Sequence, residues 1–281
     1  MADDVTDKGE RVAKVIARAG LCSRRDAERL IAEGRVTVAG KVLEGPGVTV
    51  RPGEKIAVDG AALPAAAPAR LWRYHKPAGQ ITSARDPQGR PTIYDHLPHT
   101  LPRTMPVGRL DLNSEGLLLL TNDGGLKRQL ELPATGWTRR YRVRVYGKVD
   151  EERLAALAKG VRVDGFDYGP IRARLDSRRG ANAWLTMALA EGRNREVRKV
   201  CEHLGLKVSR LIRVAYGPFQ LGQLAAGAVE EVPAKVLDEQ LGGKPRKPRT
   251  GFAKAKPKPR KPGHRKAGQR KTDHAHRRRQ A

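Results

Sequence analysis

Four consecutive leucines, Leu117 to Leu120, stand between Gly116 and a run of turn-forming residues, Asn122 to Gly125. A short apolar run bounded by turn signals is typical of a β-strand that is buried on both faces. Such a strand can exist only inside a domain that covers both of its faces. The run therefore predicts a rigid core strand.

An acidic residue, Asp111, lies in the polar segment just before this strand, two positions after Arg109. Loops that lead into rigid core strands often carry catalytic groups. An aspartate in a loop is more often a turn former or a cap, and the residues alone favour that interpretation. A calcium loop is excluded, because the position of its closing bidentate carboxylate is Asn122 and leucines replace the later ligands.

The composition points to a polyanionic partner. The chain has 281 residues, 39% of them hydrophobic, and a formal net charge of +26, which is typical of proteins that neutralise phosphates. No run is long enough to span a membrane, and the charged start MADDVTDKGE is no secretory signal. Cys22 and Cys201 form no metal-binding pair, so we expect a cytoplasmic protein without a disulfide or a metal site.

Residues 9–60 form a small separate module in this interpretation. Apolar residues recur at helical spacing from Val12 to Ala19, and Ser23 with Asp26 gives a capping signal for a second helix. Short strands with turns at Gly40 and Gly53 follow. Two helices followed by strands, with many basic residues, resemble the S4 RNA-binding domain. An ordinary solvated helix face is the alternative explanation of those charges.

The rest of the chain divides into three further segments. Residues 61–70 are a Pro/Ala linker, and residues 71–240 mix hairpin-like strands with helices, which predicts an α+β catalytic domain with a mixed, largely antiparallel sheet. Asp150 is expected to cap a helix, and Gly160 and Gly205 to end helices. Residues 241–281 hold 16 Lys and Arg against one acid, so we expect a disordered basic tail.

Four stretches resemble, in order and spacing, the motifs of ribosomal RNA pseudouridine synthases of the RsuA/RluB type. They are LWRYHKPAGQITS from Leu71, GRLDLNSEGLLLLTNDG from Gly108, RRYRVRVYG from Arg139, and EGRNREVRKVCEHLGLKVSRLIRVAYGPFQL from Glu191. Within the last motif the family often has His-Gln where this chain has Arg195-Glu196. We therefore expect Glu196 to place a negative charge beside the RNA-binding face.

The resemblance implies a cofactor-free isomerase that converts a uridine of RNA into pseudouridine. It places the catalytic aspartate at Asp111, the active-site tyrosine at Tyr141 and the active-site arginine at Arg198. The carboxylate would act as nucleophile or base on a flipped-out uridine, with the guanidinium keeping it ionised and the tyrosine stacking on the uracil. Attack on the sugar, attack on the base and formation of a glycal all remain open.

Further basic residues are expected to contact RNA. Lys76 is interpreted as a structural or RNA-facing residue and not as a catalyst. The full set of expected RNA-binding residues is Arg109, Lys76, Arg24, Arg25, Arg29, Arg35 and Lys41.

The basic tail resembles that of the large-subunit members of the family, so 23S ribosomal RNA, free or in a pre-ribosomal particle, is the favoured substrate of a monomer. One alternative is a non-enzymatic S4-type RNA-binding factor in ribosome assembly, which would need neither Asp111 nor Arg198. A second is a hydrolase that releases a base, but it would need an activated, often metal-bound water, and the sequence lacks a suitable carboxylate cluster.

Overall fold

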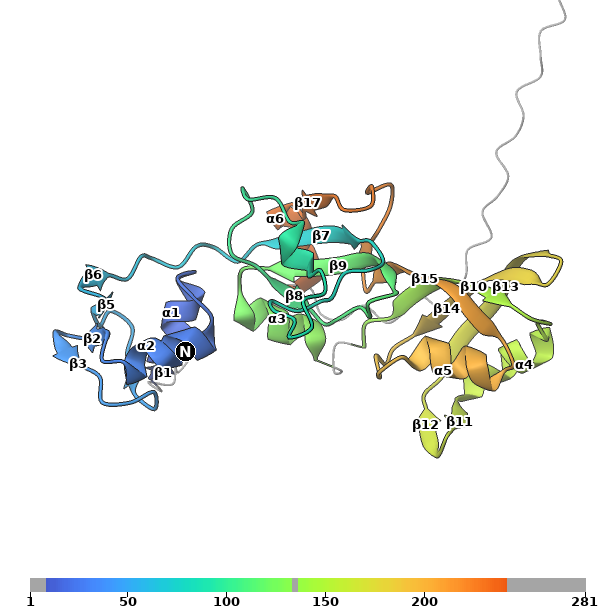
Figure 1. The fold of residues 1–281 in the computed structure, drawn as a ribbon, viewed down its shortest axis with the longest axis horizontal. Coiled ribbons are helices and arrows are strands. Elements are labelled where there is room, and N and C mark those ends of the chain that lie inside the picture. Colours follow the sequence, from blue (N-terminus) through green and yellow to red (C-terminus); the bar gives the residue numbers. More distant parts are fainter. Residues whose placement is uncertain (1–8, 133–135, 242–281) are drawn as a thin grey trace, which may run out of the picture. The chain divides into compact units, whose positions relative to one another are not determined.

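The computed structural model describes residues 9–132 and 136–241 (Figure 1). The basic tail therefore lies outside the described residues, except for Leu241. Within the described part, the chain combines helices with largely antiparallel sheets, which confirms the predicted α+β class. No helix in these ranges has the length and apolar character needed to cross a membrane.

The N-terminal segment packs two helices against a small antiparallel sheet. Its core consists of apolar residues from both helices and the strands, with Val12, Ile16, Ile31 and Val36 at 0 or 1% exposure. The Ser23 hydroxyl accepts a hydrogen bond from the backbone N–H of Asp26 (3.1 Å), as the capping signal predicts. The elements are β1 (Glu10–Arg11), α1 (Val12–Arg18), α2 (Arg24–Ala32), β2 (Val36–Val38), β3 (Lys41–Val42), β4 (Thr49–Val50), β5 (Ile56–Val58) and β6 (Ala61–Ala62).

A mixed sheet organises the larger segment. Its strand order is β13-β14-β10-β15-β9-β7-β17, with β8 paired to β9 and β16 paired to β15. Among these pairs only β9 and β15 run parallel. The bounds are β7 (Leu71–Lys76), β8 (Met105–Val107), β9 (Glu115–Thr121), β10 (Arg139–Tyr146), β13 (Ile171–Arg179), β14 (Asn182–Leu189), β15 (Lys207–Tyr216), β16 (Phe219–Gln220) and β17 (Val229–Glu231).

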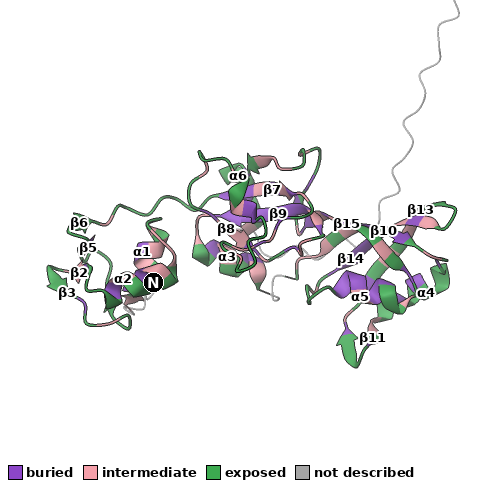
Figure 2. Cartoon of the chain, viewed as in Figure 1, coloured by how far each residue is buried: buried purple, intermediate pink, exposed green. Residues whose placement is uncertain are grey.

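The leucine run forms β9 and is buried on both faces, as predicted. Leu117 and Leu119 belong to one core cluster and Leu118 and Leu120 to another, because successive strand residues point to opposite faces. Figure 2 shows this strand as almost entirely buried. Each buried leucine side chain contributes about 1.5–3 kcal/mol, so the position of β9 in the sheet is strongly fixed.

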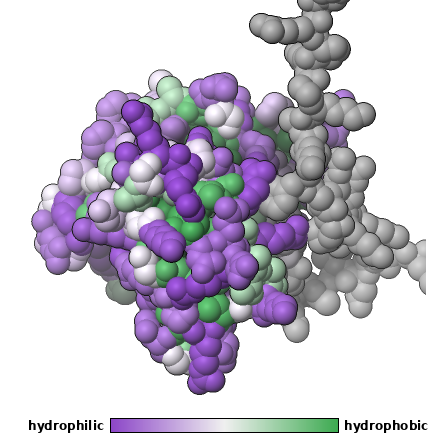
Figure 3. Space-filling model, turned by 90° about the vertical axis from the view of Figure 1, so that its right-hand side faces the viewer, coloured by the Kyte–Doolittle hydropathy of each residue, from purple (hydrophilic) through white to green (hydrophobic). Residues whose placement is uncertain are grey.

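Helices cover different faces of the two ends of the sheet. Helices α4 (Glu151–Ala156) and α5 (Glu196–His203), with the hairpin of β11 (Val161–Val163) and β12 (Phe166–Tyr168), pack on one face of β10, β13 and β14. Helices α3 (Gly124–Glu131) and α6 (Ala234–Leu241) contribute to the core beside β7 and β9. Figure 3 shows hydrophilic residues predominating on the side it presents.

The helix ends largely follow the sequence signals. Asp150 caps α4, and Gly160 and Gly205 adopt positive φ where helices end, as expected. The segment predicted only as a turn, Asn122 to Gly125, instead begins helix α3. Asp123 caps that helix through the backbone N–H of Leu126 (2.6 Å).

Gly116 marks a close approach between β9 and β15. A Cβ atom on Gly116 would lie 2.3 Å from the carbonyl oxygen of Arg213, and its φ of +100° is strained for any other residue. Only glycine lets the two strands pair here, at the point where the loop that carries Asp111 enters the sheet.

The buried ammonium of Lys76 holds that loop. Lys76 is fully buried at the end of β7, and its Nζ donates hydrogen bonds to the carbonyl oxygens of Pro77 (3.0 Å), Asp111 (3.2 Å), Leu112 (3.4 Å) and Ser114 (2.9 Å). An ammonium has three N–H donors, so these four carbonyls share them. The loop therefore depends on this side chain for its backbone hydrogen bonding.

Burial also changes the protonation of this side chain. It lowers the pKa of Lys76 from 10.5 to about 8, while the carboxylates of Asp111 and Glu115 act in the opposite direction.

We expect Gly116→Ala to destabilise the protein severely, because the added methyl group collides with backbone and not with a flexible side chain. Gly79→Ala is the matched control, since Gly79 also has positive φ (+87°) but open space around it. Thermal unfolding should show a much larger loss for Gly116→Ala. Equal losses in the two variants would contradict the close approach.

We expect the stability difference between wild type and Lys76→Met to grow with pH. Folded Lys76 releases its proton near pH 8, whereas in the unfolded chain it keeps the proton to about 10.5, so between these values the unfolded state binds more protons. The contribution of Lys76 to the free energy of unfolding therefore rises with pH, by roughly 3 kcal/mol over that window. Urea unfolding of both proteins at pH 7.5 and pH 10 measures this difference in the free energy of unfolding.

The exposed residue Lys148 provides the control for this experiment. The difference between wild type and Lys148→Met should stay constant with pH. A difference for Lys76→Met that is constant or shrinks would contradict the assignment.

Candidate active site

A cleft of 1080 Å³ lies against the loop between β8 and β9 and is bordered by β10, β15 and the start of α5. Three residues expected at the site, Arg109, Asp111 and Tyr141, line it. The fourth, Arg198, is not among the lining residues, but its neighbour Val197 is. The structure thus brings together groups from four motifs that are far apart in the sequence.

Asp111 is half-buried, and its carboxylate accepts no hydrogen bond and forms no ion pair within the described residues. Its backbone is firmly held instead. The carbonyl oxygen of Asp111 accepts hydrogen bonds from the backbone N–H of Ser114 (3.0 Å) and from Lys76 Nζ (3.2 Å). The loop therefore presents an uncommitted carboxylate on a fixed backbone, which is an arrangement suited to a nucleophile or a base.

Arg198 approaches the same loop from helix α5. It is 9% exposed, and its Nη2 donates a hydrogen bond to the carbonyl oxygen of Asn113 (2.8 Å). Within the described residues it forms no ion pair with Asp111 inside 4.0 Å, and its buried Nε has no partner. Burial and the neighbouring Arg195 lower the pKa of Arg198, whereas Asp111 raises it. An arginine stays charged under burial, so it supplies a positive field next to the carboxylate.

Tyr141 lies at an irregularity in the sheet. Its register partners are Met187 on β14 and Arg213 on β15, and the pairing with β15 shifts between Arg140 and Tyr141. Bulges of this kind re-aim side chains and are frequent beside active sites. Tyr141 is half-buried and packs against two core clusters, so its ring is held firmly at the cleft.

Arg213 is a site residue that the sequence analysis missed. It is 3% exposed, donates hydrogen bonds to the carbonyl oxygens of Leu117 (Nε, 2.7 Å) and Arg109 (Nη1, 3.5 Å), and stacks on the ring of Tyr216. Its buried Nη2 has no partner among the described residues. The sequence did contain a signal for its burial. Strand alternation places Arg213 on the same face as the apolar residue Leu211, which indicates that this arginine faces the core.

Glu196 is among the residues that line the cleft but is almost fully buried, so its effect on RNA binding stays a prediction. The side chain is 3% exposed, and its Oε2 accepts a hydrogen bond from the backbone N–H of Arg193 (2.9 Å). Burial raises the pKa of Glu196. Through this hydrogen bond the residue stabilises the turn that begins α5, where Arg195 adopts a φ of +53°.

Lys76, which was expected to be either structural or RNA-facing, is fully buried in this structure, and its burial agrees with the structural interpretation. Arg109, in contrast, is exposed and lines the cleft.

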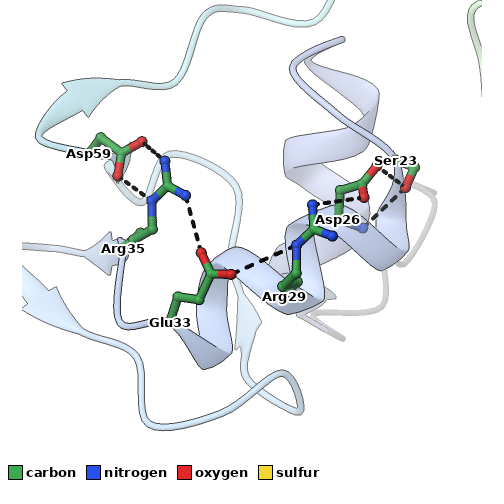
Figure 4. Close-up of polar contacts among 6 residues, drawn as sticks. All are labelled: Ser23, Asp26, Arg29, Glu33, Arg35 and Asp59. Carbon is green, nitrogen blue, oxygen red and sulfur yellow. Dashed lines mark hydrogen bonds and ion pairs between the residues drawn. The ribbon is translucent and has the colours of Figure 1, made fainter.

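The five basic residues of the N-terminal segment that were expected to bind RNA fall into two groups. Arg35 forms a two-pronged ion pair with Asp59 (2.8 and 2.7 Å) and also contacts Glu33, and Arg29 pairs with Asp26 (Figure 4). These two arginines are engaged by neighbouring acids. The others are exposed without an ion pair among the described residues, and they are Arg24, Arg25 and Lys41.

No group of three or more His, Cys, Asp or Glu side chains suited to a metal ion occurs within residues 9–132 and 136–241. Cys22 and Cys201 are both free thiols, and burial raises the pKa of Cys201 to about 12.

Comparisons with known proteins agree with this arrangement. The family model for RNA pseudouridylate synthases matches residues 70–203, and the model for S4 domains matches residues 10–56. A protein of Rickettsia felis named an uncharacterized RNA pseudouridine synthase is 46% identical over 230 residues, covering 82% of this chain and 100% of the relative. Ribosomal large subunit pseudouridine synthase B of Salmonella typhi is 44% identical over 218 residues, covering 75% of each chain.

Solved structures include a similar fold as well. A crystal structure of a pseudouridylate synthase aligns with a TM-score of 0.58 and 26% identity, covering 83% of this chain and all of the other. With these relatives and the two matching domain models, the chain belongs to the RNA pseudouridine synthase family and carries an S4 domain ahead of its synthase domain.

Proposed function

We propose that this enzyme isomerises a uridine of ribosomal RNA, with large-subunit 23S RNA as the favoured substrate, and that Asp111 carries the reaction. The observation that supports this most strongly is the carboxylate of Asp111, which has no partner among the described residues and lies on a loop whose carbonyls are bound by Lys76 and Arg198. The substrate class rests on the Salmonella typhi relative, which is named for the large ribosomal subunit. The net charge of +26 is consistent with an RNA partner.

The reaction exchanges one bond to the ribose for another. The bond from the sugar to N1 of uracil breaks, a bond from the sugar to C5 forms, C5 loses its proton, and N1 gains one. The overall change is an isomerisation without net oxidation, so it requires no redox partner. The base must rotate between the two steps, and therefore it must first leave the stacked RNA.

The residues of the cleft divide this work in our proposal. Asp111 is the nucleophile or base, and the same carboxylate could act on the sugar or on the ring. The half-buried ring of Tyr141 stacks on the flipped uracil. The buried guanidinium groups of Arg198 and Arg213 place positive charge beside the carboxylate. Exposed Arg109 contacts a phosphate near the target.

The N-terminal S4 domain would add contacts to the RNA backbone. Its unpaired cations Arg24, Arg25 and Lys41 are the better candidates for phosphate contacts, because Arg29 and Arg35 are already engaged by carboxylates. Such contacts add affinity but do not distinguish one RNA sequence from another. Selectivity for the target sequence must therefore come from the cleft. We place the reaction in the cytoplasm. A purely non-enzymatic assembly role is disfavoured by the family and by a cleft that a pure binder does not need.

We expect Asp111→Asn to abolish turnover while RNA affinity stays nearly unchanged. The amide is almost isosteric but cannot act as a carboxylate nucleophile or base. Pseudouridine yield on ribosomal RNA, mapped by carbodiimide-blocked primer extension with enzyme in excess, measures it. Asp238→Asn, at an exposed position on α6, is the control and should retain full activity. A rate for Asp111→Asn within about tenfold of wild type, a barrier change of only ~1.4 kcal/mol, would remove Asp111 from the mechanism.

Arg198→Lys should lower the single-turnover rate at least tenfold with little change in RNA affinity. Lysine keeps a charge but loses the planar fork that reaches Asn113 from α5. Arg128→Lys is the control, because Arg128 is exposed on helix α3 and is not among the residues that line the cleft. Rates within twofold of wild type for both variants would show that the guanidinium geometry is unimportant.

A further inference from the structure

At the end of the catalytic sheet formed by β10, β13 and β14, the described residues place helices on one face only. On β10 the side chains of Val143 and Val145 point into the core beneath α4 and α5, whereas Arg142 and Arg144 alternate with them and are exposed. We call this exposed side of β10, β13, β14 and β15 the rear face. Figure 2 shows exposed residues along β10, β13 and β15, whereas the residues of β14 are buried or half-buried.

The rear face is densely cationic. The register of the four strands places side chains from β10, β13 and β15 on the same surface. All of its long basic residues are exposed, and they are Arg140, Arg142, Arg144, Arg172, Arg174, Arg179, Lys207 and Arg210. An exposed face of an antiparallel sheet needs polar residues, but it does not need residues of one sign.

Few acids offset these charges. Among the described residues, Asp176 pairs with Arg174 (2.9 Å) and Glu115 pairs with Arg210 (2.8 Å). Arg144 stands directly opposite Arg210 across β10 and β15. Glu115 offsets the charge of Arg210, whereas Arg144 has no ion pair among the described residues, so its charge is available to a bound polyanion.

The aromatic residue in the middle of this face is not free to stack on bases. The guanidinium of Arg142 lies over the ring of Trp184 at 4.7 Å, so it covers the ring and is itself held flat on the surface. Unstacked bases need open aromatic platforms, whereas the phosphates of an RNA helix need only fixed cations. Tyr146, at the end of β10, is exposed on the same side, but a single ring at the edge of the face provides no row of stacking platforms. The fixed cations therefore fit the backbone of a double helix better than they fit a single strand.

We propose that the rear face binds the phosphate backbone of an RNA helix, distinct from the segment that enters the active cleft. Tyr141 and Arg142 are neighbours on β10 and point to opposite sides of the sheet, so an RNA segment in the cleft does not occupy the rear face. A folded ribosomal RNA presents several helices at once. The inference rests on the RNA substrate proposed above, and it adds a second contact that contributes affinity without chemistry.

Binding of the full-length protein to a uridine-free, 20-base-pair G–C RNA duplex tests the proposal by fluorescence anisotropy. The rear-face variant combines three residues without an ion pair among the described residues, Arg144→Gln, Arg172→Gln and Arg179→Gln. The control variant removes the same charge from exposed sites elsewhere, with Lys159→Gln, Arg162→Gln and Lys235→Gln. Circular dichroism checks that both variants are folded.

We expect the rear-face variant to bind the duplex at least about tenfold more weakly than wild type, and the control no more than threefold. The slope of log affinity against log salt should become shallower by about 2 to 3 for the rear-face variant, since about three phosphate contacts are lost. Equal weakening in both variants would overturn the proposal, because the face would then be only part of a diffuse positive charge.

The outcome is independent of the chemistry, because the duplex offers no uridine. With ribosomal RNA as substrate, the rear-face variant should also need more RNA to reach the wild-type rate, while the rate at saturation stays unchanged. A fall in the saturated rate with unchanged duplex binding would contradict the proposal. If the wild-type protein forms no pseudouridine but the rear-face variant still loses duplex affinity, the proposed function is refuted while the proposed role of the rear face is supported.

Discussion

The buried ammonium of Lys76 is the interaction on which the site depends. The loop from Arg109 to Ser114 runs from one strand to the next without pairing regularly in the sheet, so its carbonyl groups need other partners. Lys76 binds three of them, at Asp111, Leu112 and Ser114. A fully buried charge is costly, and its reduced pKa of about 8 reflects that cost. The fold accepts it because the same charge supplies hydrogen bonds that the loop cannot make internally.

Two further cations complete this arrangement from other strands and helices. Arg198 binds the carbonyl of Asn113 and Arg213 binds those of Arg109 and Leu117, so three buried cations hold one loop through its backbone. Among the described residues, none of these cations forms an ion pair or a hydrogen bond with the carboxylate of Asp111. The positive charge that fixes the loop also surrounds the acid, so in our account one set of contacts provides both rigidity and electrostatics. Gly116 permits it by letting β9 approach β15 at Arg213.

Local patterns in the sequence predicted the fold better than they predicted the partners of each charge. The leucine run, the Ser23 cap and the helix ends at Gly160 and Gly205 are short-range signals, and the structure confirms them. Lys76 was included among the expected RNA-binding residues because a lysine usually faces solvent. Its carbonyl partners at Asp111, Leu112 and Ser114 are distant in sequence, so only the tertiary structure reveals them. Arg213 was missed among 56 basic residues for the same reason. The burial of Glu196 was also not evident from the sequence, because it depends on the turn at the start of α5, where the backbone N–H of Arg193 donates a hydrogen bond to this carboxylate.

The central claim is that Asp111, held by these cations, moves the ribose from N1 to C5 of a uracil. Release of tritium from ribosomal RNA labelled at C5 of its uridines tests this most directly, because forming the new carbon–carbon bond must expel the C5 hydrogen into water. We expect wild-type enzyme to release one tritium for every pseudouridine formed, with no free uracil in solution. Free uracil, or complete absence of tritium release from a folded enzyme given its ribosomal RNA, would contradict the account.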